Sequence, residues 1–591
     1  MNLPKLREPV TTRQIVDVFK GYNHNMRISD GEFFNMKNMT SDHYPILSPR
    51  GKRGVYASPA SPQGLIAKDA LCYVDGSKFV INEYPVEMGL SDGPKQLISM
   101  GAFVIIMPDR KWINTYDPTE FGNIDAEVTT SSPVSFTLCR LDGEEFSSDA
   151  IPTAEPEEPE NMALWIDTST KPHSLKQWSE SAGMWVTVPT TYVKISSPGI
   201  GAAFEKYDGV YISGLKDTVL HDHVTGNVIE DTSDLEALES NMARWEKDDD
   251  YIVVIGILDV TRTITESITV SRKMPIMDYV VESGNRLFGC RYGENDKGEI
   301  VNEIYASKLG DFKNWNCFMG MSTDSYAASC GTDGQFTGAI THLGQPIFFK
   351  ENCVHKVYGS YPATFQIQDT ACRGVQKGCH KSLAIVNETL FYKSRSGICA
   401  YDGSLPGEVS YAMGIEAYSD AVGGSHGNKY YISMKGKDGY QLFVYDMAKS
   451  MWHKEDDLRV DSFCSCDGEM YAIANGQIIT LFGSAEQDDA PVEWMVQTGD
   501  IGLSSPDMKY ISRLTVRMAM DVGSEINFYA QYDFSEEWEH LFAMHGTNLR
   551  SFSVPIRPKR CDHMRLRIEG VGGAKIYSIA KTIEQGSELS W

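Results

Sequence analysis

The sequence predicts an all-β protein, a β-propeller of about six to eight blades with an inserted β-rich domain and a C-terminal β-sandwich. First, a unit of two apolar strands around a Gly, Asn or Asp turn recurs along the chain, which is typical of antiparallel hairpins with one buried face. Second, the later copies follow one another at intervals of about 40 residues, as propeller blades do. Third, the 591 residues, 42% of them hydrophobic, suffice for two to four domains with their own cores. The copies lie at residues 279–292, 342–359, 384–403, 427–446 and 463–483.

Residues 1–60 are predicted to form an extended arm that lies along the propeller and closes it. Within them, residues 19–56 carry apolar side chains every few positions and end in a basic stretch with Arg50, Lys52 and Arg53. We regard these three cations as candidate contacts to a partner, because exposed charge steers association between proteins.

Residues 61–124 are predicted to form the first propeller blades. Two hairpin units at 64–82 and 95–117 match the later copies in length and aromatic content. Their turns are expected at Asp75 and at Pro108 to Asp109, where Asp and Pro favour tight turns.

Residues 125–271 are predicted to form an inserted β-rich domain. An acidic, proline-rich run at 151–161 is expected to be a turn or a solvated linker, and one short helix is expected at 231–247. Trp165, Trp178 and Trp185 are candidate contact residues, although aromatic side chains in strands also fill cores.

The remaining blades are predicted at 272–498 and a jelly-roll-like sandwich at 499–591. In the last segment, short runs alternate apolar and polar residues with a period of two, as strands with one buried face do. The basic residues Arg557, Lys559 and Arg560 stand out there. A nucleic-acid patch is one interpretation, and an ion-pair surface between subunits is the favoured one.

The net charge of −26 argues against a protein that wraps nucleic acid through phosphate contacts. The N-terminus lacks the apolar run of a secretory signal, and no apolar run is long enough to span a membrane. We therefore expect a chain made and folded in a cytoplasm, with its twelve Cys residues mostly reduced and buried.

The search for catalytic motifs predicts no enzyme, no cofactor and no metal site. The sequence has no phosphate-binding loop, no HExxH and no GxSxG. The Cys and His residues at 353, 355, 372, 379 and 380 lack paired metal-ligand spacing. Asp75, Asp109, Asp402 and Asp467 are expected to stabilise turns. A propeller glycosidase, which would use a pair of carboxylates, stays open as an alternative.

Three segments resemble bacteriophage tail and neck structural proteins. The entry segment has Gly31 and Glu32, then Asn35 or Asn38, and later Arg53 with Gly54. A second phrase, of the form I-Y-x-S-x-L-G-D-x-x-x-W, is matched by Ile304, Tyr305, Ser307, Leu309, Gly310, Asp311 and Trp315. The stretch 554–579 is similar to the terminal sandwich of such proteins.

This resemblance implies a structural virion protein of a phage tail, of the nozzle or hub type that stabilises the packaged genome. It implies a homo-oligomeric ring, contacts with other tail or neck proteins, double-stranded DNA passing without sequence-specific contacts, and assembly in the bacterial host cytoplasm. An acidic lumen would let DNA slide, because like charges repel. The alternatives are a host-surface receptor or carbohydrate-binding tail protein and, second, the propeller glycosidase.

Overall fold

The computed structural model describes residues 5–6, 10–131, 133–146, 151–215, 220–221, 226–228, 242–243, 249–258, 262–295, 298–318, 320–483, 489–533, 535–546, 548–585 and 589–590. The predicted all-β class is confirmed: these residues form strands, turns and three short 3-10 helices, and none of them lies in an α-helix. The helix expected at 231–247 falls outside the described residues, apart from a two-residue strand, β24 (Met242–Ala243). The chain divides into two compact units.

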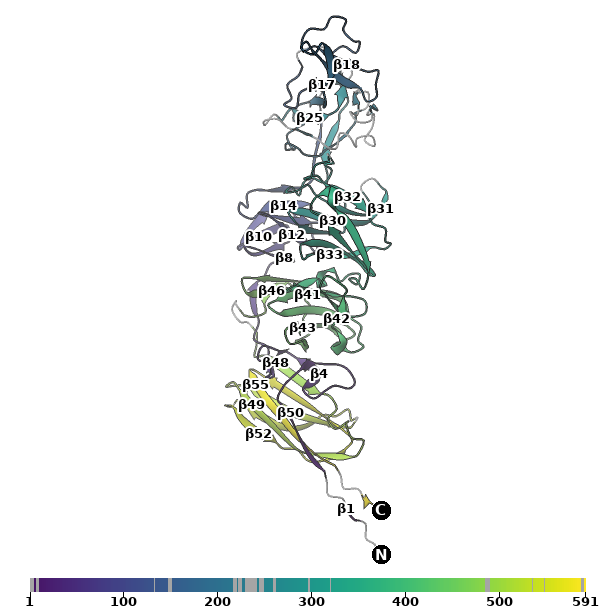
Figure 1. Ribbon diagram of the computed structural model, residues 1–591. Helices are drawn as coiled ribbons and strands as arrows, with labels where there is room; N and C mark the ends of the chain where they lie inside the picture. The colour runs from purple at the N-terminus through teal and green to yellow at the C-terminus, as the bar shows by residue number, and fades with distance from the viewer. Residues whose placement is uncertain are drawn as a thin grey trace. The chain divides into compact units, whose positions relative to one another are not determined.

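Unit 1 comprises Met1–Lys95, Phe349–Val354 and Thr370–Trp591. Its described residues include three antiparallel sheets of four strands and a further antiparallel set of four strands, β41–β44, that begins a ten-stranded sheet (Figure 1). Their strands are β8 (Pro62–Lys68), β9 (Ala70–Asp75), β10 (Lys78–Ile81) and β11 (Tyr84–Glu87); β37 (Ala384–Val386), β38 (Thr389–Lys393), β39 (Ile398–Tyr401) and β40 (Gly407–Glu408); β41 (Ser419–His426), β42 (Lys429–Gly436), β43 (Gly439–Asp446) and β44 (Met451–Lys454); and β45 (Ser462–Cys466), β46 (Glu469–Ala474) and β47 (Gln477–Thr480) with β7 (Gly54–Ala57).

The first strands of these sheets are neighbours: β37 lies beside β41, β41 beside β45, and β45 beside β8. Alternation of apolar residues along each strand buries the faces between neighbouring sheets. The rings of Phe391 and Tyr430, for example, stack with centroids 5.1 Å apart. The N-terminal ends of β8, β41 and β45 lie around one cavity, which is the candidate site.

The N-terminal arm is woven into unit 1 by strand pairing. β7 completes the sheet of β45–β47, with Val55 opposite Ile479. β3 (Gly21–Tyr22) pairs with β44, and β4 (Glu32–Lys37) pairs with β48 (Glu493–Thr498). β5 (Met39–Thr40) and β6 (Ser48–Pro49) form a small hairpin sheet. These pairings fix the arm in place, since each backbone donor and acceptor that they satisfy would otherwise need another partner.

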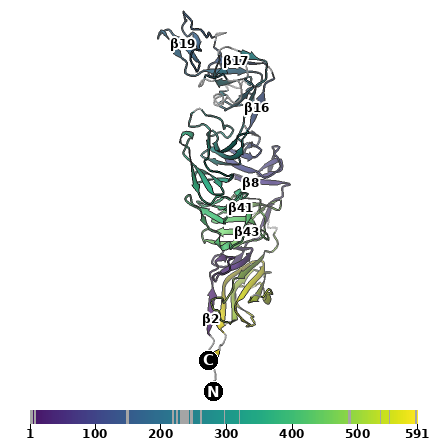
Figure 2. The ribbon, with the colours of Figure 1, turned by 90° about the vertical axis from the view of Figure 1, so that its right-hand side faces the viewer.

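The C-terminal part of unit 1 contains two sheets. One consists of β2 (Thr11–Val16), β55 (Ala574–Gln585), β49 (Lys509–Met520) and β52 (Arg550–Val554), with β53 (Arg560–Cys561) also on β49. The other continues from β48 through β54 (Met564–Val571) and β50 (Glu525–Tyr532) to β51 (Glu539–His545). Figure 2 shows the purple strand β2 alongside the yellow C-terminal strands. Near the chain ends, β1 (Lys5–Leu6) pairs with β56 (Leu589–Ser590).

Unit 2 comprises Gln96–Phe348 and His355–Asp369. Two four-stranded sheets belong to it, and β12 lies beside β29, which in turn lies beside β33. The sheets consist of β12 (Gln96–Met100), β13 (Phe103–Met107), β14 (Lys111–Asn114) and β15 (Phe121–Asn123), and of β29 (Tyr279–Ser283), β30 (Arg286–Glu294), β31 (Ile300–Ala306) and β32 (Tyr326–Ser329). A further sheet is made of β33 (Phe336–His342), β34 (Gln345–Lys350), β35 (Cys353–Tyr358) and β36 (Gln366–Ala371), whose ends are divided between the two units.

Between β15 and β29, unit 2 has further sheets with a core of their own, in which Phe136, Ile195 and Val254 are fully buried. The strands are β16 (Ala126–Thr129), β17 (Val134–Cys139), β18 (Leu164–Asp167), β19 (Ser174–Ser179), β20 (Met184–Thr187), β21 (Tyr192–Ser196), β22 (Tyr211–Ser213), β23 (Leu220–His221), β25 (Tyr251–Ile255), β26 (Ile257–Leu258), β27 (Arg262–Ile264) and β28 (Thr269–Arg272), besides β24. Among them, β18, β19 and β20 form a separate antiparallel sheet. Across the described parts of both units, no helix has the length and apolar character needed to span a membrane.

Candidate functional site

A cavity of about 430 Å³ opens in unit 1 beside the N-terminal ends of strands β8, β41 and β45. Its walls come from the start of β8, the loop at 92–94, the 3-10 helix η3 (His380–Ser382), the start of β41, and the loop that leads into β45. Three carboxylates (Asp92, Asp420 and Asp461) and two cations (Lys381 and Arg459) line it. A cavity of this size accommodates a small ligand, and convergent polar groups would orient that ligand.

Asp420 is placed by an irregularity at the start of β41. The register of β41 against β42 shifts between Ser419 and Val422, and Asp420 adopts a left-handed backbone conformation with φ of 48°. Aspartate tolerates this region better than most residues, and a bulge turns a side chain in a new direction. The hydroxyl of Tyr440 donates a hydrogen bond to the Asp420 carboxylate. This hydrogen bond raises the pKa of the Tyr440 hydroxyl.

Asp461 precedes β45 and is held from two sides. Its carboxylate oxygen Oδ1 lies 3.2 Å from Nη2 of Arg459, and its backbone carbonyl accepts a hydrogen bond of 3.0 Å from Nζ of Lys381. The Arg459 guanidinium also lies over the Tyr440 ring, 5.3 Å from its centroid. Arg459 therefore joins Tyr440 and Asp461 into one polar group on this wall.

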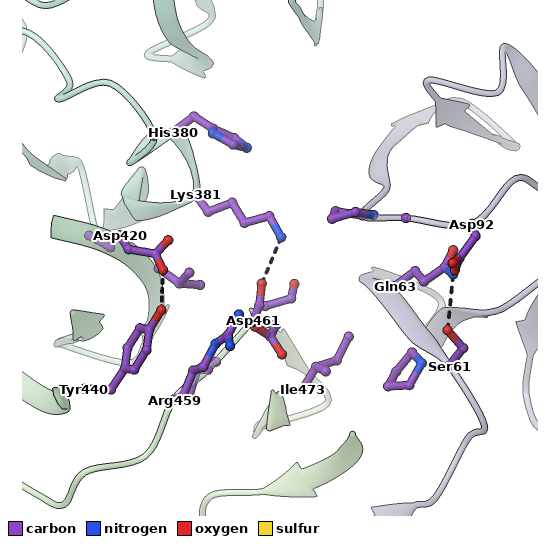
Figure 3. Close-up of a pocket in the computed structure, with 18 residues that line it drawn as sticks. Ser61, Gln63, Asp92, His380, Lys381, Asp420, Tyr440, Arg459, Asp461 and Ile473 are labelled. Carbon is purple, nitrogen blue, oxygen red and sulfur yellow. Dashed lines mark hydrogen bonds and ion pairs between the residues drawn. The ribbon is translucent and has the colours of Figure 1, made fainter. Parts of the chain in front are cut away.

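Asp92 stands on the opposite wall (Figure 3). Its Oδ1 accepts a hydrogen bond of 2.5 Å from Nε2 of Gln63, which also contacts Oγ of Ser61 at 3.3 Å. In Figure 3, Ser61, Gln63 and Asp92 face Lys381 and Asp461 across the pocket. The other amide atom of Gln63, Oε1, is enclosed and has no hydrogen-bond partner among the described residues.

His380 and Lys381 both have lowered pKa values. Desolvation in the wall, reinforced by the neighbouring Lys381, lowers the pKa of the His380 imidazole to about 4, so the ring is neutral near pH 7. Desolvation lowers the pKa of the Lys381 ammonium, and the carboxylates of Asp461 and Asp420 act against it. Perturbed titratable groups in a cleft are a physical indication of a functional site.

Chemically, the pocket offers hydrogen-bond acceptors, hydrogen-bond donors and carboxyl groups that exchange protons. Paired carboxylates carry out general acid and base catalysis, and in glycosidases they cleave a sugar acetal. In the described residues, no group of three His, Cys, Asp or Glu side chains is arranged to hold a metal ion.

The sequence analysis did not single out Asp92, Asp420 or Asp461. The signal available was positional, because Asp420 lies at the beginning of the first strand of a repeated unit and Asp461 directly before one. Of the aspartates singled out instead, Asp402 lies in a bend, where its Oδ1 accepts from the backbone N–H of Ser404 at 2.9 Å. Asp75 is the last residue of β9, and its Oδ1 accepts from the backbone N–H of Ser61 at 2.7 Å.

The three basic residues of the arm have different environments. Arg53 is buried and pairs with Glu455 at 2.6 Å and Asp456 at 2.7 Å. Burial acts to lower the pKa of its guanidinium, but these two carboxylates outweigh burial and raise it. Arg50 pairs with Asp489 at 2.9 Å, whereas Lys52 is partly exposed. Both arginines thus form ion pairs within the chain.

The three tryptophans of the insertion are brought together. Trp165, Trp178 and Trp185 come from β18, β19 and β20, and the Trp185 ring lies 5.5 Å from Trp165 and 5.4 Å from Trp178, centroid to centroid. All three are partly exposed. Arg557 and Lys559, in the connection between β52 and β53, and Arg560, the first residue of β53, are exposed, and Lys559 pairs with Glu539.

Comparison with known proteins gives neither a family model nor a curated protein that matches this chain. Among solved structures, it is similar to an exo-β-1,3-galactanase from Phanerochaete chrysosporium (8% identity, 51% of this chain and 94% of that one, TM-score 0.21). A family 43 arabinoxylan arabinofuranohydrolase from Bacillus subtilis matches with 7% identity over 52% and 95%, TM-score 0.19. An acylaminoacyl peptidase matches with 10% identity over 56% and 57%, TM-score 0.23.

The prediction that this chain is not an enzyme is wrong on this finding, because the similar structures are enzymes, two of them glycoside hydrolases. The pocket gives the physical reason why motif searching failed: its carboxylates come from separate loops and strand ends and form no contiguous sequence motif. TM-scores near 0.2 transfer neither a reaction nor a substrate to this chain.

Proposed function

We propose that the pocket of unit 1 binds a carbohydrate and hydrolyses a glycosidic bond. The observation that carries this proposal is the set of three carboxylates, Asp92, Asp420 and Asp461, around one cavity of about 430 Å³. Sugar hydroxyl groups both donate and accept hydrogen bonds, so they suit a wall where carboxylates alternate with Lys381 and Arg459.

The surroundings of the three carboxylates support different roles. Arg459 lies beside Asp461, with Nη2 3.2 Å from the carboxylate Oδ1, and the Tyr440 hydroxyl donates a hydrogen bond to the Asp420 carboxylate. Among the described residues, the hydrogen bond that the Asp92 carboxylate receives comes from the neutral amide of Gln63. We assign Asp461 to activate water and Asp92 to donate a proton. Water then gives one proton to Asp461 as its oxygen adds to the anomeric carbon, the glycosidic C–O bond breaks, and the departing oxygen takes the proton from Asp92.

The test measures reducing ends released from a panel of plant, fungal and bacterial polysaccharides. The wild type is expected to cleave one class, and Asp461→Asn and Asp92→Asn are each expected to lower the rate by roughly 10²–10⁴-fold, with binding retained. Glu87→Gln, an exposed carboxylate of β11 outside the pocket, is the matched control. Cleavage unaffected by the two pocket variants would refute the assignment.

The architecture that accompanies this proposal is a β-propeller of about six to eight blades. In unit 1 its blades would be the sheets that begin with β8, β37, β41 and β45, with the arm strand β7 as the outer strand of the sheet that begins with β45. Three features support it: the four-stranded meanders, the contacts between their first strands within each unit, and the pairing of β7 with β47. Residues 125–271 would be the insertion and 499–591 a jelly-roll-like sandwich.

A second candidate function is a component of a phage tail, of the nozzle or hub type. It is carried by the sequence resemblance, whose residues hold the arm in this chain. Gly31 has φ of 91°, Asn38 donates to the Glu493 carbonyl at 2.8 Å, and Arg53 is buried in ion pairs. The net charge of −26 suits a lumen through which DNA slides.

In this second proposal, the chain forms a ring with copies of itself in a virion and contacts other tail or neck proteins. Native mass spectrometry and negative-stain imaging over a concentration series test it. A closed ring with a channel is expected, and a monomer at every concentration, both alone and with purified tail proteins, would contradict it.

A further inference from the structure

The sheet of β18–β20 in unit 2 presents an aromatic face to solvent. In its registers, Trp178 lies opposite Trp185, and Trp165 lies opposite Lys176. Residues opposite each other, and residues two apart along a strand, share one face of a sheet. Trp165, Lys176, Trp178 and Trp185 therefore occupy the same face, which we call the tryptophan face.

The other face of this sheet is the one that packs inward. Ile166 and Leu175 alternate with the tryptophan-face residues, are nearly fully buried, and belong to the core of the insertion. The tryptophan face is thus the outer face, and its three rings remain partly exposed. Clustered aromatic side chains at a surface are a mark of interaction sites, where tryptophan is enriched.

The tryptophan face already holds one cation. The Lys176 ammonium lies 4.7 Å from the centroid of the Trp165 ring and 2.5 Å from Oδ2 of Asp167. A cation between an aromatic face and a carboxylate is stabilised by the ring quadrupole and by the opposite charge. Trp178 and Trp185 have no cation over them among the described residues, so two rings of the same kind are available for further cations.

An acidic rim borders the tryptophan face. The proline-rich run at 151–161, which the sequence predicts to be a turn or a solvated linker, is fastened to this sheet at both ends. At its start, the indole N–H of Trp165 donates to the Thr153 carbonyl at 3.3 Å. At its end, the backbone N–H of Ala163 donates to the Glu160 carbonyl at 3.0 Å and that of Trp178 to the Ala163 carbonyl at 2.9 Å.

Four exposed carboxylates lie along this run: Glu155, Glu157, Glu158 and Glu160. None of them has an ion-pair or hydrogen-bond partner within the described ranges of the chain. Pro156 and Pro159 restrict the backbone between the carboxylates. The rim therefore concentrates unpaired negative charge beside exposed indole rings and is partly ordered before any partner arrives, which lowers the entropic cost of binding.

We propose that the tryptophan face and its acidic rim bind an arginine- and lysine-rich segment of a partner protein. The charge of the rim is complementary to such a segment, and the indole rings accept its guanidinium and ammonium groups as Trp165 accepts Lys176. Arginine suits this surface best, because its planar guanidinium stacks on aromatic rings and pairs with carboxylates.

The test uses the full chain and a fluorescent twelve-residue peptide of alternating Arg and Gly, followed by anisotropy. The wild type is expected to bind it, with affinity falling as salt rises. Trp178→Ala with Trp185→Ala is expected to weaken binding by roughly tenfold. The quadruple variant Glu155→Gln, Glu157→Gln, Glu158→Gln and Glu160→Gln is expected to weaken binding similarly and to flatten the salt dependence.

Two controls keep the result decisive. Tyr84→Ala with Tyr116→Ala removes two rings that are 76% and 72% exposed elsewhere, and it should bind the peptide like the wild type. A peptide with Glu in place of Arg should not bind. The quadruple glutamine variant changes only exposed side chains, so it tests the rim even if the tryptophan variant fails to fold. The proposal would be overturned if the wild type, the tryptophan-face variant and the acidic-rim variant bound the Arg peptide equally well. It would also be overturned if the chain bound neutral oligosaccharides and not the peptide.

Discussion

Replacing Arg53 should loosen strand β7, which joins the N-terminal arm to the sheet of β45–β47. The Arg53 side chain is only 8% exposed and contacts Glu455 and Asp456, which are 9% and 20% exposed. Removing one partner of a buried ion pair costs about 3–5 kcal/mol, because a charge remains without compensation. Arg50 stays within 3.9 Å of Glu455 and 3.5 Å of Asp456. The expected loss for Arg53→Met is therefore at the lower end, about 3 kcal/mol.

Hydrogen exchange of the β7 amides measures this loss locally. Arg53 directly precedes β7, whose residues Gly54 and Val55 pair with Thr480 and Ile479. If the arm opens as a unit, 3 kcal/mol corresponds to roughly 150-fold faster exchange. Lys52→Met is the matched control, because this substitution also removes a positive charge, but from the adjacent and partly exposed position. Equal exchange rates of β7 in the two variants would refute the reasoning.

Two further predictions concern unit 1. His453 is buried, its Nδ1 lacks a hydrogen-bond partner in the described structure, and burial lowers its pKa to about 3 despite Asp446 and Asp42 nearby. The unfolded chain therefore binds a proton below pH 6.5 that the native chain excludes, so stability falls as pH falls from 6.5 towards 3, by about 1.4 kcal/mol per pH unit. Urea denaturation should show the gap between wild type and His453→Gln changing over this range, and parallel pH profiles would contradict the prediction. Gly21 has φ of 84°, and a Cβ there would lie 2.3 Å from the Trp452 carbonyl oxygen; Gly21→Ala should thus destabilise the chain by more than about 1 kcal/mol, measured as a lower melting temperature, whereas Gly51→Ala, with open space around it, should not.

The sheets were predictable where their signal was local. The segment at 427–446 alternates around a turn, and the structure pairs β42 with β43 along it. Side chains with a period of two and a Gly-containing turn determine such a hairpin without help from distant residues. The pairing of β7 with β47 had no comparable signal, because it joins short strands more than 400 residues apart.

The candidate site was not predictable for a related reason. Asp420 reaches the pocket through a register shift and a left-handed backbone, and neither leaves a mark in a simple alternation pattern. Asp92 and Asp461 belong to separate loops that only the packing of the sheets brings together. The tryptophan cluster was suggested by composition, but its union with the acidic rim depends on strand register and backbone hydrogen bonds.

Saturation-transfer NMR tests most directly whether the pocket holds a sugar. The wild type, screened against the same glycan classes, is expected to transfer saturation to the protons of one class. Ser462→Trp, which fills the cavity from its wall, is expected to abolish the transfer, and Ser58→Trp, on the surface outside the pocket, is expected to preserve it. Transfer that persists in Ser462→Trp, or no transfer from the wild type to any glycan, would contradict a carbohydrate site at Asp92, Asp420 and Asp461.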